Sequence, residues 1–165
     1  MQQHLAARRG FTLIEQVVVI VLLGIVAVYA ASRYTGIPAF SSVTTQSEVL
    51  ASLRLTQNRA MQRTGFCNRW LVSNNQAQQV SPSVSAGACT TSLLSPATDS
   101  SFVDAAANDI TLTLTNNDGS YFLDFDSLGR ATQCFTANCT VTLNNLQSGE
   151  SRQMCINSEG YIYAC

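Results

Sequence analysis

The sequence predicts an α+β protein in which one long N-terminal helix precedes an antiparallel, β-rich domain. Three observations carry this prediction. Residues 17–31 read VVVIVLLGIVAVYAA, a block in which the Tyr29 hydroxyl is the only polar side-chain group. Apolar residues then recur at three- and four-residue steps as far as Met61, which is the period of a helix. From Asp109 onward, short stretches that alternate apolar and polar residues are separated by turn sequences, as in strands.

Composition excludes several classes of function. The 165 residues carry a formal net charge of −1, only 12% are charged, and all nine basic residues are arginine. The only histidine, His4, precedes the apolar block, which leaves no histidine for a catalytic triad in the later domain and excludes a multi-histidine zinc site or an HExxH motif. The near-neutral charge gives no electrostatic basis for nucleic-acid binding. We therefore expect no enzyme, no cofactor, no metal and no nucleic-acid partner.

The apolar block is long enough to span a membrane. Residues 11–32 contain a single charge, Glu15, and as a helix they would be about 33 Å long, against about 30 Å for the bilayer hydrocarbon core. Arg8 and Arg9 come immediately before the block, which predicts that the N-terminus stays cytoplasmic and that the rest crosses.

The main alternative is a secretory signal peptide, cleaved near Ala30 or Ala31. Two features argue against it: the block is longer than an ordinary signal's apolar region, and it contains Glu15. A carboxylate in the membrane costs several kcal/mol unless it is paired, and a segment that is only discarded has no use for it.

Residues 8–15, Arg-Arg-Gly-Phe-Thr-Leu-Ile-Glu, resemble the cleavage site of type IV prepilins. The resemblance implies that a membrane peptidase cuts after Gly10 and that the new N-terminal residue, Phe11, is N-methylated. It also implies an assembly role for Glu15, four positions further on. Gln16 departs from the family, in which leucine is commoner there.

The physical chemistry of Glu15 agrees with this resemblance. A carboxylate in the first turn of a helix is favoured by the helix dipole. In a packed bundle of such helices it can pair with the amine of Phe11, from its own chain or a neighbour, and so fix the axial register of the subunits.

Beyond the apolar block, the triplet Gly36-Ile37-Pro38 predicts an interruption of the helix. The helical pattern resumes over residues 42–63, and Gly65 is placed to end it. One predicted face of this second part carries the apolar residues Val43, Leu50, Leu53, Ala60 and Met61.

These boundaries predict three parts. Residues 1–10 are a leader peptide. Residues 11–65 are the helix, of which 11–32 span the membrane and 42–64 pack on the head. Residues 66–165 form a disulfide-bonded, β-rich head domain.

Within the head, strands are predicted over residues 110–115, 121–125, 140–143, 153–157 and 161–164. A strong turn, Asn-Asn-Asp-Gly, follows the first of these at residues 116–119. Residues 68–108 are rich in small polar residues and predict a long variable region, with weaker strands around 70–73 and 79–83. Six to eight short strands are expected in all.

All six cysteines follow the membrane segment, on the side where disulfides persist. Fifteen connectivities are open. Cys134 and Cys139 flank a four-residue link, and Cys155 and Cys165 straddle the last hairpin, although a simple two-residue hairpin would not place those two opposite each other. If both of these pairs form disulfides, Cys67 and Cys89 remain to form the third.

Acidic residues around the turns at Asp118 and Asp124-Phe125-Asp126 raise the question of calcium. The EF-hand spacing fails, because Leu128 and Phe135 stand where acids are needed. Ordinary β-turn acids are the preferred interpretation, and no metal site is predicted.

The order of elements also resembles the minor pilins and minor pseudopilins, the lollipop architecture of type IV pilins. The segments at residues 55–61, 125–130 (Phe-x-x-x-Gly-Arg) and 155–163 resemble the subgroup related to pseudopilin H. Residues 20–34 and the cysteine-bearing end resemble minor pilins of the mannose-sensitive haemagglutinin (MSHA) pilus.

The expected function is therefore a minor pilin that assembles into, or primes, an extracellular type IV pilus and contributes to surface attachment. The implied partners are other pilins through the N-terminal helix, the prepilin peptidase and the inner-membrane assembly platform. The implied location is the bacterial inner membrane in a single pass, with the head periplasmic, and afterwards the pilus. The alternatives are a minor pseudopilin of a type II secretion system and a secreted disulfide-rich binding protein.

Overall fold

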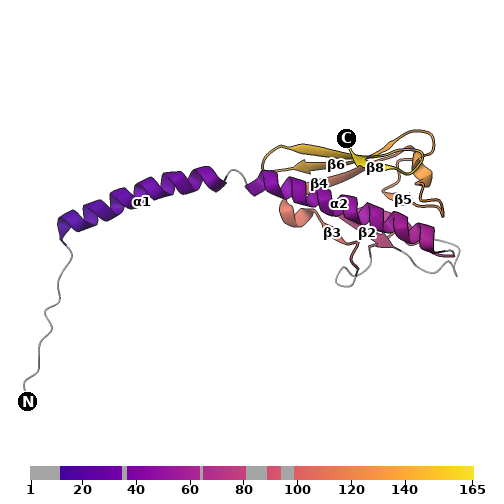
Figure 1. Cartoon of the computed structure of the whole chain (residues 1–165), viewed down its shortest axis with the longest axis horizontal. Coiled ribbons are helices and arrows are strands. Elements are labelled where there is room, and N and C mark those ends of the chain that lie inside the picture. Colours follow the sequence, from indigo (N-terminus) through magenta and orange to yellow (C-terminus); the bar gives the residue numbers. More distant parts are fainter. Residues whose placement is uncertain (1–11, 35–36, 64, 81–88, 94–98) are drawn as a thin grey trace, which may run out of the picture. The chain divides into compact units, whose positions relative to one another are not determined.

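The structure is a computed structural model that describes residues 12–34, 37–63, 65–80, 89–93 and 99–165 (Figure 1). It has an α+β fold of the type IV pilin kind, with an apolar helix α1 (Leu13–Tyr34), a second helix α2 (Ile37–Gln62) and antiparallel sheets. The chain divides into two compact units, Met1–Ile37 and Pro38–Cys165. The second unit, which holds α2 and all the described strands, is called the head here.

Helix α2 begins earlier than the sequence pattern predicts. It starts at Ile37 rather than at residue 42, because Pro38 falls in the first turn, where a missing backbone N–H and a fixed φ are tolerated. The described helices nevertheless end and begin on either side of residues 35 and 36, close to the predicted interruption. After α2, Gly65 adopts a left-handed φ of 81°, which suits a residue that ends a helix.

The described strands form two four-stranded sheets that are antiparallel throughout. The first has the order β3 (Val103–Asp104), β2 (Gln76–Val80), β1 (Arg69–Ser73) and β5 (Phe122–Asp124). The second has the order β4 (Ile110–Thr115), β6 (Cys139–Asn145), β7 (Ser151–Ile156) and β8 (Ile162–Ala164). Short 3-10 helices, η3 (Ala106–Asn108) and η4 (Thr132–Cys134), lie in the connections.

The β1–β2 hairpin corrects the strand predicted over residues 79–83. Strand β2 starts at Gln76, because Asn74 and Asn75 both adopt left-handed φ values, 52° and 60°, and close a two-residue turn between Ser73 and Gln76. Asparagine tolerates this conformation better than most residues do. Residues 81–83 lie outside the described part of the chain.

The turn at residues 116–119 also acts differently from a hairpin turn. Gly119 has a φ of 71°, as a tight turn requires. The strands on its two sides, β4 and β5, nevertheless belong to different sheets. The turn therefore carries the chain from one sheet to the other.

The core of the head lies between α2 and the sheets, and Figure 1 shows α2 lying along the strands. Trp70, Leu123, Val141 and Met154 are fully buried in one cluster with Leu53 of α2. At about 25 cal/mol per Å² of apolar surface, this burial is the main force that holds α2 on the sheets.

The face that α2 buries differs from the predicted one. Val43 and Met61 are 42% and 48% exposed, although Leu53 and Ala60 are buried as expected. The buried face includes four hydroxyl residues: Ser42, Thr45, Ser52 and Thr56. Leu50, also predicted on this face, packs against the core. Helical periodicity of apolar residues alone therefore finds only part of the buried face of this helix.

Three disulfides lie in the head: Cys67–Cys89, Cys134–Cys139 and Cys155–Cys165. They join the same cysteines as the pairing favoured by the sequence. Cys165 reaches Cys155 because its backbone N–H bonds to the carbonyl of Gln153 at 3.2 Å, one step beyond the last β7–β8 pair.

Candidate functional site

The first candidate site is the apolar helix α1. Its segment Leu13–Ala31 is long and apolar enough to cross a membrane, and none of it is buried within the protein. A signal sequence would pass the same test of length and composition. Side chains such as Leu13 and Val28, which are 83% and 76% exposed, have their apolar surface open to lipid or to another helix.

Thr12 caps the beginning of α1, a role that was not predicted from the sequence. The Glu15 N–H donates to the Thr12 hydroxyl at 3.3 Å and to the Thr12 carbonyl at 3.1 Å. Thr-x-x-Glu at the start of an apolar run is the sequence signal of such a cap. The cap fixes Glu15 in the first turn, where the helix dipole favours a negative charge.

Gly10 and Phe11, the expected cleavage and methylation residues, lie outside the described residues. Within the part of α1 that the structure describes, no cationic side chain makes an ion pair with Glu15. The pairing of Glu15 with the amine of Phe11 therefore stays an expectation.

The comparisons with known proteins bear on this N-terminal segment. Residues 5–31 match the family model described as the prokaryotic N-terminal methylation motif. The match includes Gly10, Phe11 and Glu15, and it leaves the head unmatched. Searches of curated proteins and of solved structures returned no significant match to the chain.

The fold and the motif together support a type IV pilin-like protein. The motif supports a prepilin that is processed by a prepilin peptidase, anchored in the inner membrane and assembled with other pilins as a subunit of a pilus or pseudopilus. It indicates a structural subunit and not an enzyme.

A second notable site is the contact of α2 with two turns of the head. The side-chain amide of Gln57 donates to the carbonyl of Gly129 at 2.7 Å and to the carbonyl of Gly160 at 2.7 Å. Both glycines adopt left-handed φ values, 79° and 84°. One side chain of α2 therefore holds two turns that are 31 positions apart in the sequence.

This contact joins the three segments on which the resemblance to pseudopilin H depends. Gln57 belongs to residues 55–61, Gly129 to residues 125–130, and Gly160 to residues 155–163. In the middle segment, the carboxylate of Asp126 accepts hydrogen bonds from the backbone N–H groups of Leu128 and Arg130 and pairs with the Arg130 guanidinium at 2.8 Å.

These contacts set the acidity of Asp126. Burial raises the pKa of its carboxyl, but the hydrogen bonds from Arg130 and Leu128 and the charge of Arg130 outweigh it and leave the pKa below the ordinary value of 3.8. The carboxylate thus acts as the centre of an ordinary turn. No group of three or more His, Cys, Asp or Glu within the described residues could hold a metal ion.

Asp124 also has a partner within the chain. The Arg69 guanidinium binds it with two hydrogen bonds, of 2.7 and 2.8 Å, and lies 3.5 Å from the centre of the Phe122 ring. Arg69 also donates to the carbonyl of Thr90 at 3.3 Å, so together with the Cys67–Cys89 bond it ties the segment 89–93 to β1.

A buried polar network joins α2 to the first sheet. The Trp70 indole N–H donates to the Ser52 hydroxyl at 2.9 Å, and that hydroxyl donates to the carbonyl of Ser101 at 2.5 Å. Arg59 extends the network to Gln79 and to the carboxylate of Asp99. Burial raises the pKa of Asp99, but the hydrogen bonds from Ser101 and Arg59 outweigh this effect. The pKa therefore lies below its ordinary value.

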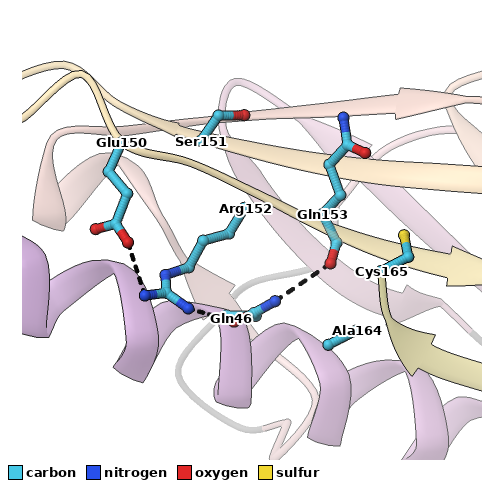
Figure 2. Close-up of a pocket in the computed structure, with 7 residues that line it drawn as sticks. All are labelled: Gln46, Glu150, Ser151, Arg152, Gln153, Ala164 and Cys165. Atoms are coloured by element: carbon cyan, nitrogen blue, oxygen red, sulfur yellow. Dashed lines mark hydrogen bonds and ion pairs between the residues drawn. The ribbon is translucent and has the colours of Figure 1, made fainter.

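A polar hollow lies where α2 meets β7. Figure 2 shows the side chain of Gln46 between Arg152 and Gln153, which also line the hollow. The Gln46 amide donates to the carbonyl of Gln153 at 3.2 Å and accepts from Arg152 at 3.3 Å. Arg152 in turn pairs with Glu150 at 2.6 Å. The sulfur of Cys165, at the edge of the hollow, is held in a disulfide, so the hollow contains no free nucleophilic thiol.

Proposed function

We propose that this chain is a minor pilin. It inserts in the inner membrane, is cleaved after Gly10, is N-methylated on Phe11, and joins or primes an extracellular type IV pilus. The observation that carries the proposal is the position of Glu15: a carboxylate in the capped first turn of a span-length apolar helix, inside the matched methylation motif.

The mechanism follows from the exposure of α1. In the membrane, lipid surrounds its apolar side chains. During assembly the α1 helices of neighbouring pilins replace the lipid, and Glu15 meets the amine of a Phe11, which offsets the desolvation of both charges and sets the register. The prepilin peptidase and the inner-membrane assembly platform are the partners of these two steps.

The head supports the finer assignment. Three disulfides suit the periplasm and the exterior. The contact of Gln57 with Gly129 and Gly160 supports a relation to the subgroup of pseudopilin H, because it links the segments that resemble it. A minor pilin of the MSHA type, active in surface attachment, remains our preferred member of this group.

The experiment is to determine the first residue and the mass of the processed chain. We expect a chain that begins with N-methylated Phe11, and replacement of Gly10 by leucine should leave the leader attached. A chain that begins near Ala31 would instead identify a secreted disulfide-rich protein and would overturn the proposal.

The second candidate function is a minor pseudopilin of a type II secretion system, which the same resemblance favours. A deletion strain separates the two. Loss of surface filaments with normal secretion of exported enzymes supports the pilus, and the reverse result supports the secretion system.

A further inference from the structure

Three exposed apolar side chains lie around the beginning of α2. Phe40, Val43 and Leu146 are 73%, 42% and 69% exposed. Phe40 and Val43 belong to the first two turns of α2, and Leu146 lies in the turn between β6 and β7. These three residues are called the proximal patch.

Hydrogen bonds hold the Leu146 turn next to the start of α2. The buried side chain of Asn145 donates to the hydroxyls of Ser41 and Ser42 at 3.3 and 3.2 Å. The Leu146 N–H donates to the carbonyl of Asp109 at 2.9 Å. The proximal patch is therefore made of fixed elements of the head.

The length of chain between the membrane span and the patch limits where the patch can lie. The span-length segment ends at Ala31, nine residues before Phe40. Even fully extended, nine residues reach at most about 32 Å, and less when part of them is helical. A tether this short keeps the patch at a high local concentration next to the membrane surface.

We propose that the proximal patch rests on the lipid surface from which α1 emerges, and so docks the head on the membrane before the subunit is assembled. Aromatic and large aliphatic side chains at the bilayer interface bury apolar surface there. The proposal depends on the membrane anchor in the proposed function. It depends neither on assembly into a pilus nor on cleavage after Gly10.

The charge around the patch indicates which lipids it meets. The Asp109 carboxylate accepts a hydrogen bond from Gln147, next to Leu146, and Arg152 is already paired with Glu150. Within the part of the chain whose side chains the structure describes, the patch is therefore apolar without a free cationic group beside it, and its docking needs no anionic lipid, unlike that of a basic membrane-binding helix.

The test uses the full-length chain in vesicles of phosphatidylcholine with brominated acyl chains, which quench tryptophan near the bilayer. Phe40→Trp and Leu146→Trp each place a reporter in the patch, and the native Trp70 is fully buried in the head and supplies a constant background. We expect both variants to show a blue shift and loss of emission, and phosphatidylglycerol should not be needed.

Leu128→Trp is the matched control. Leu128 is 67% exposed, almost as much as Leu146. It precedes Gly129, which is bound to Gln57, and Gln57 lies 15 residues beyond Ser42, or about 23 Å further along α2. Its tryptophan should stay unquenched.

Leu23→Trp, in the middle of α1, reports on the span itself. If Leu23→Trp is quenched while both patch reporters stay unquenched like Leu128→Trp, the docking proposal is wrong. The membrane anchor then still holds, and a neighbouring subunit becomes the expected partner of the patch. If Leu23→Trp is also unquenched, the chain has no membrane span, and the docking proposal and the proposed function both fail.

Discussion

Gly160 packs against the backbone of Gly129 so closely that a β-carbon on Gly160 would lie 2.2 Å from the Gly129 carbonyl oxygen. The same oxygen accepts the hydrogen bond from Gln57. The two turns and the helix therefore meet at a point where only a glycine fits at position 160, and this contact adds to the apolar packing that holds α2 on the sheets.

Replacement of Gly160 by alanine should destabilise the head strongly. Left-handed strain contributes about 1–2 kcal/mol and the clash with Gly129 about 1–3 kcal/mol. We expect the free energy of unfolding, measured with urea on the oxidised protein, to fall by about 2–5 kcal/mol. Gly149→Ala is the matched control: its φ of 70° is similar but its β-carbon would meet nothing within 4 Å, so a loss of about 1 kcal/mol is expected. Equal losses for both variants would contradict the close contact.

Ser52→Ala should leave the Trp70 indole N–H without its acceptor. An unpaired buried donor costs about 1–3 kcal/mol, and the loss should appear in the urea midpoint together with a change in tryptophan emission. Ser47, on the exposed side of the same helix, bonds only to the carbonyl of Val43 among the described contacts. Ser47→Ala should change stability by less than about 0.5 kcal/mol, and the interpretation is wrong if it matches Ser52→Ala.

The carboxylate of Asp126 should make the free energy of unfolding of the head depend on pH below about pH 4. Since its folded-state pKa is below the ordinary value of 3.8, its contribution is fully present above about pH 4 and is lost as the pH falls through the lower folded value. Asp126→Asn should therefore lower stability at pH 7 by about 1 kcal/mol, and the difference from the parent should shrink below pH 4 in urea titrations. A difference that is constant from pH 7 to pH 2 would refute this. Glu159→Gln, in an exposed neighbouring turn, removes the same charge and should change the stability little at pH 7.

Glu15→Ala should leave membrane insertion intact, because it makes α1 more apolar. It should reduce incorporation into sheared filaments by roughly tenfold or more, since loss of one partner of a buried charge pair costs several kcal/mol. Glu48→Ala removes an exposed acid from α2 and should incorporate normally. Equal incorporation of the Glu15 and Glu48 variants would show that the register does not depend on Glu15.

The sequence predicts the fold class and most strands of the second sheet, because alternation of apolar and polar residues is strong there. On α2 it succeeds only in part. Leu53 is buried as predicted, but Val43 is exposed and the hydroxyl residues Ser42 and Thr56 are buried, because hydropathy does not reveal that the fold supplies hydrogen-bond partners for a hydroxyl. The hairpin at Asn74 was missed because Asn-Asn is a weaker turn signal than Asn-Gly. In the candidate site, Glu15 is evident from the sequence, whereas the role of Gln57 depends on two carbonyls that only the tertiary structure brings together.

The positions of the disulfides have a mechanical consequence. Each bond closes a local loop, with separations of 22, 5 and 10 residues, and α2 contains no cysteine. No covalent cross-link thus fastens this helix to the strands beneath it. Separating α2 from the strands, for example under a pulling force, would therefore require no disulfide to be broken.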